Sequence, residues 1–233
     1  MTTRYCHGDQ AVPPSSPNLI PLRMDHAYLR GAPDSAYWSI APHLIQQATD
    51  CSCSLATAVM LINAVLGREG HLRIGGPVSE ASLLDKLGDA FWREAVAQDG
   101  NGLSLTEFAA AMERALQSYE CAGTWSVAIT PVNDAEAAAV DLRAALRAME
   151  NGAAGFVAAN FHLDLFYGDA VDVGHFSPVG AYDAARDLVL MLDVYKKDYE
   201  PMWAPLPRLA KAMATLSRKT GEPRGYAVVR RKR

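Results

Sequence analysis

Residues 47–65 read Gln47-Ala48-Thr49-Asp50-Cys51-Ser52-Cys53-Ser54-Leu55-Ala56-Thr57-Ala58-Val59-Met60-Leu61-Ile62-Asn63-Ala64-Val65. A polar loop with two cysteines leads directly into an apolar helix of small residues, which we expect to begin near Cys53 and to end near Leu66, before Gly67. A thiol in the first turn of a buried helix lies at the positive end of the helix dipole, which favours the thiolate. The stretch therefore indicates a cysteine nucleophile; a free cysteine that only packs in the core is the alternative.

Composition restricts the class of protein around this helix. The chain has 233 residues, of which 50% are apolar and 21% are charged, and these values are ordinary for a globular domain. The net charge of −4 gives no basic field for nucleic acid. No run approaches the length of a membrane span, and residues 1–17 lack the apolar core of a signal peptide. We therefore expect a cytoplasmic protein without nucleic-acid or membrane partners.

The order of the expected elements predicts the fold class. Residues 1–17, rich in proline and serine, are typical of an extended N-terminal arm, and residues 18–233 form one domain. We expect helices over 53–66, 81–98, 104–116, 134–149 and 205–215, and strands over 125–132, 155–161, 175–182, 188–194 and 225–230. Ser104 and Glu107 form a capping-box signature at the start of the third helix. Helices dominate the first half and strands the second, which predicts an α+β fold.

A predicted hairpin supplies partners for the cysteine. The strands that contain His175 and Asp193 flank the short polar turn 183–187. If the turn centres on Ala184, His175 lies opposite Asp193, and directly opposed Cβ atoms are about 5 Å apart. The carboxylate can then hold one imidazole tautomer and stabilise its charged form. A slip of the register by one residue would separate the pair. Together, Cys53, His175 and Asp193 have the residue types and the chain order of a papain-type site.

Gln47 is a candidate oxyanion donor. It lies six residues before Cys53, so its side-chain amide and the Cys53 backbone N–H can both donate to a tetrahedral intermediate. A surface glutamine without a role is the alternative.

These residues resemble the catalytic domain of the phytochelatin synthase family, a branch of the papain-like superfamily. The resemblance runs from about Asn18 to Val229, and its most specific part is Gly174-His175-Phe176-Ser177-Pro178 followed by Asp193-Val194. It implies a papain-like α+β fold. It also implies that Cys53 is the nucleophile, His175 the base, Asp193 the residue that orients it and Gln47 the oxyanion donor. The nucleophile is Cys53 rather than Cys51, because Cys53 stands ten residues before Asn63, as in the family.

The resemblance also indicates the substrate site, with departures from the family pattern. On its basis we expect substrate-binding residues at Ser54, Asn160, His162, Tyr199 and Trp203. Ser54 replaces a glycine. In the family, an asparagine, an aromatic residue, leucine and arginine stand where this chain has Asn160-Phe161-His162-Leu163, so an arginine that helps to bind a substrate carboxylate is absent. Asp198 and Glu200 place negative charge where the family has lysine and proline. Catalytic residues are therefore kept while the recognition surface is changed.

The resemblance implies an enzyme that cleaves the Cys–Gly amide of glutathione, or of a similar γ-glutamyl thiol peptide, by hydrolysis or by transpeptidation to phytochelatin. One alternative uses the same Cys–His–Asp chemistry for amide formation or acyl transfer with a specialised donor. A second alternative is a non-catalytic binding protein on the same scaffold.

The sequence contains no metal-binding pattern. We expect no cofactor, with zinc or cadmium acting only through thiolate complexes of the substrate, and a homodimer is compatible with the sequence. The role of Cys51 stays open between packing, metal binding and a reversible disulfide.

Overall fold

A computed structural model of the chain describes residues 18–71, 76–152 and 155–232, so the predicted arm lies outside the described residues. The helices are α1 (Ala27–Gly31), α2 (Tyr37–Ile40), α3 (Cys53–Arg68), α4 (Glu80–Leu87), α5 (Ala90–Ala95), α6 (Leu105–Ser118), α7 (Ala135–Glu150), α8 (Leu163–Tyr167) and α9 (Leu206–Met213), with 3₁₀ turns at Leu22–Met24 and Ala41–His43. No helix within these ranges is long and apolar enough to cross a membrane.

The described strands form one antiparallel sheet in the order β1-β6-β5-β4-β3-β7-β2. Their bounds are β1 (Ile20–Pro21), β2 (Trp125–Pro131), β3 (Phe156–His162), β4 (Gly174–Asp183), β5 (Leu188–Met191), β6 (Met202–Pro205) and β7 (Gly225–Arg231). Six of these strands come from the second half of the chain, and the long helix α3 and most of α6 come from the first. The predicted α+β class is confirmed.

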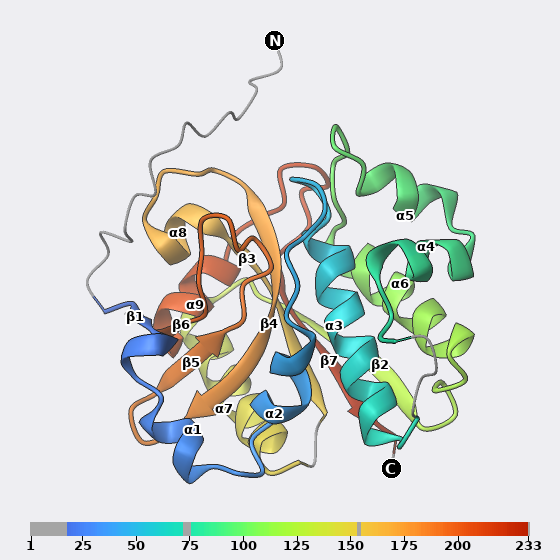
Figure 1. Cartoon of the computed structure of the whole chain (residues 1–233). Coiled ribbons are helices and arrows are strands. Elements are labelled where there is room, and N and C mark those ends of the chain that lie inside the picture. The colour runs from blue at the N-terminus through green and yellow to red at the C-terminus, as the bar shows by residue number, and fades with distance from the viewer. Residues whose placement is uncertain (1–17, 72–75, 153–154, 233) are drawn as a thin grey trace.

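Helix α3 is the centre of the molecule. It packs against the central strand β4, while α6 lies along β2 and β7. In Figure 1, α4, α5 and α6 gather on one side of α3, and α7, α8 and α9 lie on the other side. Every residue of α3 from Cys53 to Leu66 is buried. An amphipathic pattern is therefore unnecessary, and the run of small and apolar residues is what a helix enclosed on all sides requires.

The prediction of one helix over residues 81–98 is wrong, because two local signals divide it. Gly88 ends α4 in the left-handed conformation (φ 59°), which glycine adopts without a steric penalty. Asp89 then caps α5 by accepting a hydrogen bond from Trp92 N–H at 3.0 Å. The capping box predicted at Ser104 and Glu107 is confirmed: the Glu107 carboxylate accepts from the Ser104 N–H at 2.7 Å, and the Ser104 hydroxyl accepts from the Glu107 N–H at 3.3 Å.

The predicted hairpin exists, but its register differs from the prediction. Tyr182 pairs with Val189 and Val179 pairs with Met191, because the register shifts at Gly180. Leu192 N–H donates to Pro178 O at 3.1 Å and so continues the shifted register beyond β5. Asp193 consequently lies level with Ser177, and the expectation that it directly opposes His175 is wrong. His175 instead reaches the carboxylate from the diagonal position on the neighbouring strand.

Candidate active site

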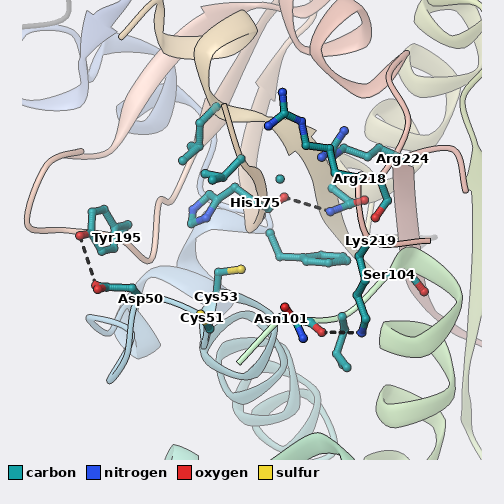
Figure 2. Close-up of a pocket in the computed structure, with 18 of the residues that line it drawn as sticks. Asp50, Cys51, Cys53, Asn101, Ser104, His175, Tyr195, Arg218, Lys219 and Arg224 are labelled. Carbon is teal, nitrogen blue, oxygen red and sulfur yellow. Dashed lines mark hydrogen bonds between the residues drawn. The ribbon is translucent and has the colours of Figure 1, made fainter. Parts of the chain in front are cut away.

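Cys53 opens onto a cavity of about 540 Å³ at the N-terminus of α3. The backbone N–H groups of a first helical turn have no acceptor within the helix, so they point toward this end. Cys53 itself is only 8% exposed. Figure 2 shows its sulfur and the imidazole of His175 facing the same space, with Asp50 and Tyr195 on one side and Arg218, Lys219 and Arg224 on the other. The structure thus brings the predicted nucleophile and the predicted base together in one cavity.

His175 is held by a fully buried carboxylate. Its Nε2 lies 2.8 Å from Oδ1 of Asp193 and 3.1 Å from the Ser177 hydroxyl. Asp193 is 0% exposed, so its carboxylate has no contact with solvent. Because the carboxylate accepts, Nε2 carries the hydrogen, which leaves Nδ1 for the thiol. The pair that the sequence predicted therefore forms in spite of the register shift.

The Asp193 carboxylate accepts two further hydrogen bonds that sequence reasoning missed. The Tyr195 backbone N–H donates to Oδ1 at 2.8 Å, and the buried Tyr167 hydroxyl donates to Oδ2 at 2.7 Å. Tyr195 follows Asp193 by two residues, so the Asx-turn pattern was a usable signal. Tyr167 lies on α8, a five-residue helix without a recognisable cap, and nothing in the sequence connects it with Asp193.

The surroundings of His175 favour its charged form. Burial lowers the pKa of His175, but the Asp193 charge, the hydrogen bond to Asp193 and the Cys53 thiol outweigh burial and raise it to about 10. The imidazole is consequently protonated at neutral pH when it is paired with Asp193. A cationic imidazole beside a thiol is the arrangement that stabilises a thiolate.

Gln47 and Asn160 hold the surrounding backbone. Gln47 is 3% exposed and lines the cavity, its N–H donates to Val194 O at 2.8 Å, and its Nε2 donates to Thr49 O at 2.7 Å. Its Oε1 has no hydrogen-bond partner among the described residues. Asn160 Nδ2 donates to His175 O at 3.2 Å and so ties β3 to the histidine. The surface-glutamine alternative is excluded by burial, and the oxyanion role of Gln47 stays a prediction.

The structure brings two of the five predicted substrate-binding residues to the cavity. Asn160 and Tyr199 line it. Ser54 does not, because it points into the protein from α3 and is 0% exposed. Trp203 is buried on β6 and donates to Asp25 O at 2.8 Å. His162 pairs with Asp172, which lines the cavity in its place. These three side chains therefore have structural contacts instead of cavity positions.

The cationic side of the cavity was not predicted from the sequence. Arg218 pairs with Asp172, and Lys219 bridges to Gly102 O at 3.0 Å and to Glu107. Arg224 is 4% exposed, and Nη1 donates to Thr215 Oγ1 at 3.0 Å and to Leu216 O. No carboxylate in the described part of the chain forms an ion pair with Arg224. Its Nε and Nη2 lie so close to Gly174 that a Cβ there would stand 2.8 Å from both, so only glycine permits this approach.

Cys51 lines the same cavity. Its Sγ lies 2.9 Å from Gly100 O, and burial together with the nearby Cys53 raises the pKa of its thiol. Within residues 18–71, 76–152 and 155–232, no group of three or more His, Cys, Asp or Glu side chains could hold a metal ion.

Comparison with known proteins gives one family. The family model described as phytochelatin synthase matches residues 22–226. Glutathione gamma-glutamylcysteinyltransferase 3 of Lotus japonicus is 54% identical over 56 residues, and these are 24% of this chain and 12% of that protein. Glutathione gamma-glutamylcysteinyltransferase 1 of Arabidopsis thaliana is 47% identical over 58 residues (25% and 12%), and the glutathione gamma-glutamylcysteinyltransferase of Schizosaccharomyces pombe is 36% identical over 56 residues (24% and 14%). The matched stretches thus span a small part of these relatives.

Proposed function

The chain belongs to the phytochelatin synthase family, and from that premise we propose that it is a thiol-dependent acyltransferase or amidohydrolase whose acyl enzyme forms on Cys53. The observation that carries this proposal is the imidazole of His175, which lies between the cavity thiol and the buried carboxylate of Asp193. A cysteine, a base and a carboxylate that orients the base are the parts of nucleophilic acyl transfer.

In the resting pair, the thiol proton is already held on Nδ1 of His175, and in the first step the Cys53 thiolate of this ion pair attacks the amide carbonyl carbon. The oxyanion of the tetrahedral intermediate accepts hydrogen bonds from Gln47 and the Cys53 N–H. The imidazolium then protonates the amine nitrogen as the C–N bond breaks, which leaves a thioester on Cys53. Throughout this step, Asp193 keeps the hydrogen of Nε2 and stabilises the imidazolium.

In the second step, an acceptor attacks the thioester while His175 takes its proton. Water gives the free acid and regenerates the thiol, so the net reaction is amide hydrolysis. The amino group of a second thiol peptide gives a new amide instead, and the net reaction is then transpeptidation.

We propose glutathione or a similar γ-glutamyl thiol peptide as the acyl donor, with glycine as the leaving group from glutathione. The names of the relatives support this substrate class. Arg224 supports it as well, since it lines the cavity, and a buried guanidinium without a carboxylate partner among the described residues is suited to interact with the carboxylate of a substrate. Zinc or cadmium would enter as a thiolate complex of the peptide, because thiolates are the ligands that these soft metals prefer.

The test is incubation of the protein with glutathione, with and without zinc or cadmium, followed by intact mass measurement and assay of released glycine. We expect Cys53 to gain the mass of a γ-glutamylcysteinyl group and glycine to accumulate. Cys53→Ala should lose both signals, while Cys121→Ser should keep both. Absence of the acyl group and of glycine under all metal conditions would overturn glutathione as the donor.

A specialised acyl donor is the second candidate, and the apolar wall of the cavity favours it. Leu163 lines the cavity beside Val171 and Val173, and Leu163 occupies the position where the resemblance predicts an arginine. An apolar group of the donor would bury surface here, whereas a second carboxylate would not find a partner. A panel of acyl donors, scored by the mass added to Cys53, separates the two candidates, because this candidate requires a larger fraction of acyl enzyme from an apolar donor than from glutathione.

A further inference from the structure

Cys51 is a second thiol in the catalytic cavity, and the proposed mechanism does not use it. It lies in the turn that leads into α3, two residues before Cys53, and both cysteines line the cavity. Its Sγ contacts only backbone carbonyls, with Gly100 O at 2.9 Å and Gln98 O at 3.6 Å. These contacts hold the thiol weakly, because a thiol is a poor hydrogen-bond donor.

The backbone between the two cysteines permits a disulfide. Ser52 has φ −95° and ψ 17°, in the bridge region beside the helical one, so Cys51 lies in a turn outside α3. In α-helical geometry, residues two apart have Cα atoms about 5.4 Å from each other. This value falls inside the range of Cα separations that disulfides span, about 4.4–6.8 Å. The two Cα atoms thus lie within disulfide range, and the disulfide forms when the turn before α3 moves the Cβ of Cys51 toward Cys53, while α3 stays in place.

The two thiols differ in reactivity. Burial raises the pKa of the Cys51 thiol, and a negative charge on Cys53 raises it further, so Cys51 is protonated at neutral pH. Cys53 faces the imidazolium of His175, whose positive charge stabilises a thiolate. The thiolate is the form that hydroperoxides oxidise, so Cys53 reacts first and Cys51 is left as a neighbouring thiol.

We propose that Cys51 and Cys53 form an oxidative modification site, at which a hydroperoxide converts the catalytic thiol into a reversible Cys51–Cys53 disulfide. The Cys53 thiolate attacks hydrogen peroxide, the O–O bond breaks, and sulfenic acid forms on Cys53 with release of hydroxide. The Cys51 sulfur then attacks the Cys53 sulfur, the S–O bond breaks, and water leaves as the disulfide forms. Two electrons pass from the two cysteines to peroxide.

The disulfide removes the nucleophile and also protects it. Without a neighbouring thiol, sulfenic acid proceeds to sulfinic acid, which thiols do not reduce, whereas a disulfide returns to two thiols by exchange with a dithiol. This proposal goes beyond acyl transfer. It depends on the reactive thiol of Cys53 and not on the identity of the acyl donor, so it can be tested when the donor is unknown.

The test uses the full chain with Cys6→Ser, a substitution in the part of the sequence outside the described residues. The protein is treated with a several-fold molar excess of hydrogen peroxide, alkylated and digested with trypsin, which places both cysteines in the peptide 31–68. We expect this peptide to lose two hydrogen atoms and to resist alkylation at both sulfurs. Dithiothreitol should restore alkylation of both.

Two further variants complete the test. With Cys51→Ser, Cys53 should accumulate as sulfinic acid, and recovery by dithiothreitol should be lost. With Cys121→Ser, which removes a thiol outside the cavity lining, the internal disulfide should form as in the parent. The parent protein alone is decisive if Cys51→Ser does not fold. Sulfinic acid on Cys53 beside an alkylated Cys51, or a disulfide between two chains, would overturn the proposal.

Discussion

The two ring nitrogens of His175 have different partners: one forms the hydrogen bonds that hold the ring, and the other is the atom that we propose to exchange a proton with Cys53. Nε2 faces Asp193 and Ser177, whereas Nδ1 is left on the side of Cys53. The carboxylate is the main cause that raises the pKa of His175 against the effect of burial. The pH dependence of the reaction should therefore depend on the charge of Asp193.

Asp193→Asn tests this dependence. The alkaline limb of kcat/KM against pH reports loss of the imidazolium proton, and wild type should hold it near pH 10. With a neutral residue at 193, only Cys53 is left to oppose the effect of burial on the pKa of His175, so we expect the limb to move down by ~1–3 pH units. An unchanged limb would mean that another group titrates there.

Unfolding gives an independent measure of the same pair. A raised pKa in the folded state stabilises the protein fully below the ordinary value of 6.5, and the contribution disappears as pH rises through about 10. The difference in free energy of unfolding between wild type and Asp193→Asn should therefore shrink between these pH values.

Tyr167 is a positioning residue for Asp193. Its hydroxyl donates to Oδ2 at 2.7 Å, and its ring stacks on Tyr199 with centroids 3.9 Å apart. Tyr167→Phe should lower kcat about tenfold, or about 1.4 kcal/mol in the barrier, with KM unchanged. The reason is that the carboxylate loses the donor that fixes its second oxygen.

Tyr199→Phe is the matched control for Tyr167→Phe. It removes the hydroxyl from the other ring of the stacked pair, but this hydroxyl contacts Asp169, and Tyr199 lines the cavity. Tyr199→Phe should therefore change KM more than kcat. Equal effects of the two variants on kcat would argue that the stack, and not the bond to Asp193, is what matters.

At the scale of elements, the register shift between β4 and β5 determines the position of Asp193 relative to His175. The register shifts at Gly180, and a Cβ added there would lie 2.7 Å from Leu192 Cγ. Leu192 is buried and precedes Asp193 directly. We expect Gly180→Ala to reduce the free energy of unfolding by ~1–3 kcal/mol, because an overpacked core must shift. Urea denaturation measures the change, and kcat should fall with it.

Gly123→Ala is the control for Gly180→Ala, since a Cβ at Gly123 would meet no heavy atom within 4 Å. Its effect on stability should stay within about 0.5 kcal/mol. A similar loss in both variants would show that the contact with Leu192 is not the cause.

The connection between α9 and β7 provides the cationic side of the cavity through Arg224. Arg224→Lys keeps the charge but loses the fork of two N–H donors, so KM for a carboxylate-bearing donor should rise about tenfold. A donor with that carboxylate amidated provides the control. Wild type should bind the amidated donor weakly. Arg224→Lys should show the same KM for it as wild type, because the interaction with the carboxylate is already absent. Equal losses with both donors would remove Arg224 from carboxylate recognition.

At the scale of the whole molecule, the site spans two parts of one core. The proposed nucleophile comes from the buried helix α3 and the proposed base from β4, and one continuous cluster of buried side chains includes residues of both elements. Trp92, Trp125 and Trp203 belong to the same cluster and lie on α5, β2 and β6. The site and the fold should therefore be lost in a single transition.

Coincident transitions would verify this expectation. In urea, tryptophan fluorescence and pulsed alkylation of Cys53 should give the same midpoint. Cys121, which is 2% exposed and lies outside the cavity lining, is the internal control and should become reactive at that midpoint too. Alkylation of Cys53 at clearly lower urea than Cys121 would show that the cavity opens before the core.

The sequence by itself determined features that depend on neighbouring residues. The helix after Cys53, the capping box at Ser104 and the existence of the β4–β5 hairpin follow from local periodicity and capping, which act within a few residues. The resemblance to the family contributed the nucleophile, base and acid, which local patterns alone left open. The division between α4 and α5 at Gly88 was also readable as a C-cap, although we assigned one helix there.

Only the tertiary structure decided how these parts meet. The register shifts at Gly180, where the backbone lies close to the Leu192 side chain, and no local pattern contains this contact, so the sequence placed Asp193 opposite His175, two residues along β4 from its true level at Ser177. Tyr167 reaches Asp193 across 26 residues, and Arg224 reaches the cavity from the far end of the chain. Trp203 matches the family, and Ser54 stands where the family has glycine, yet both side chains are buried in the core. Direction in space depends on the packing of the whole core, and for this reason the sequence predicted the meeting of Cys53, His175 and Asp193 better than it predicted the residues that line the cavity around them.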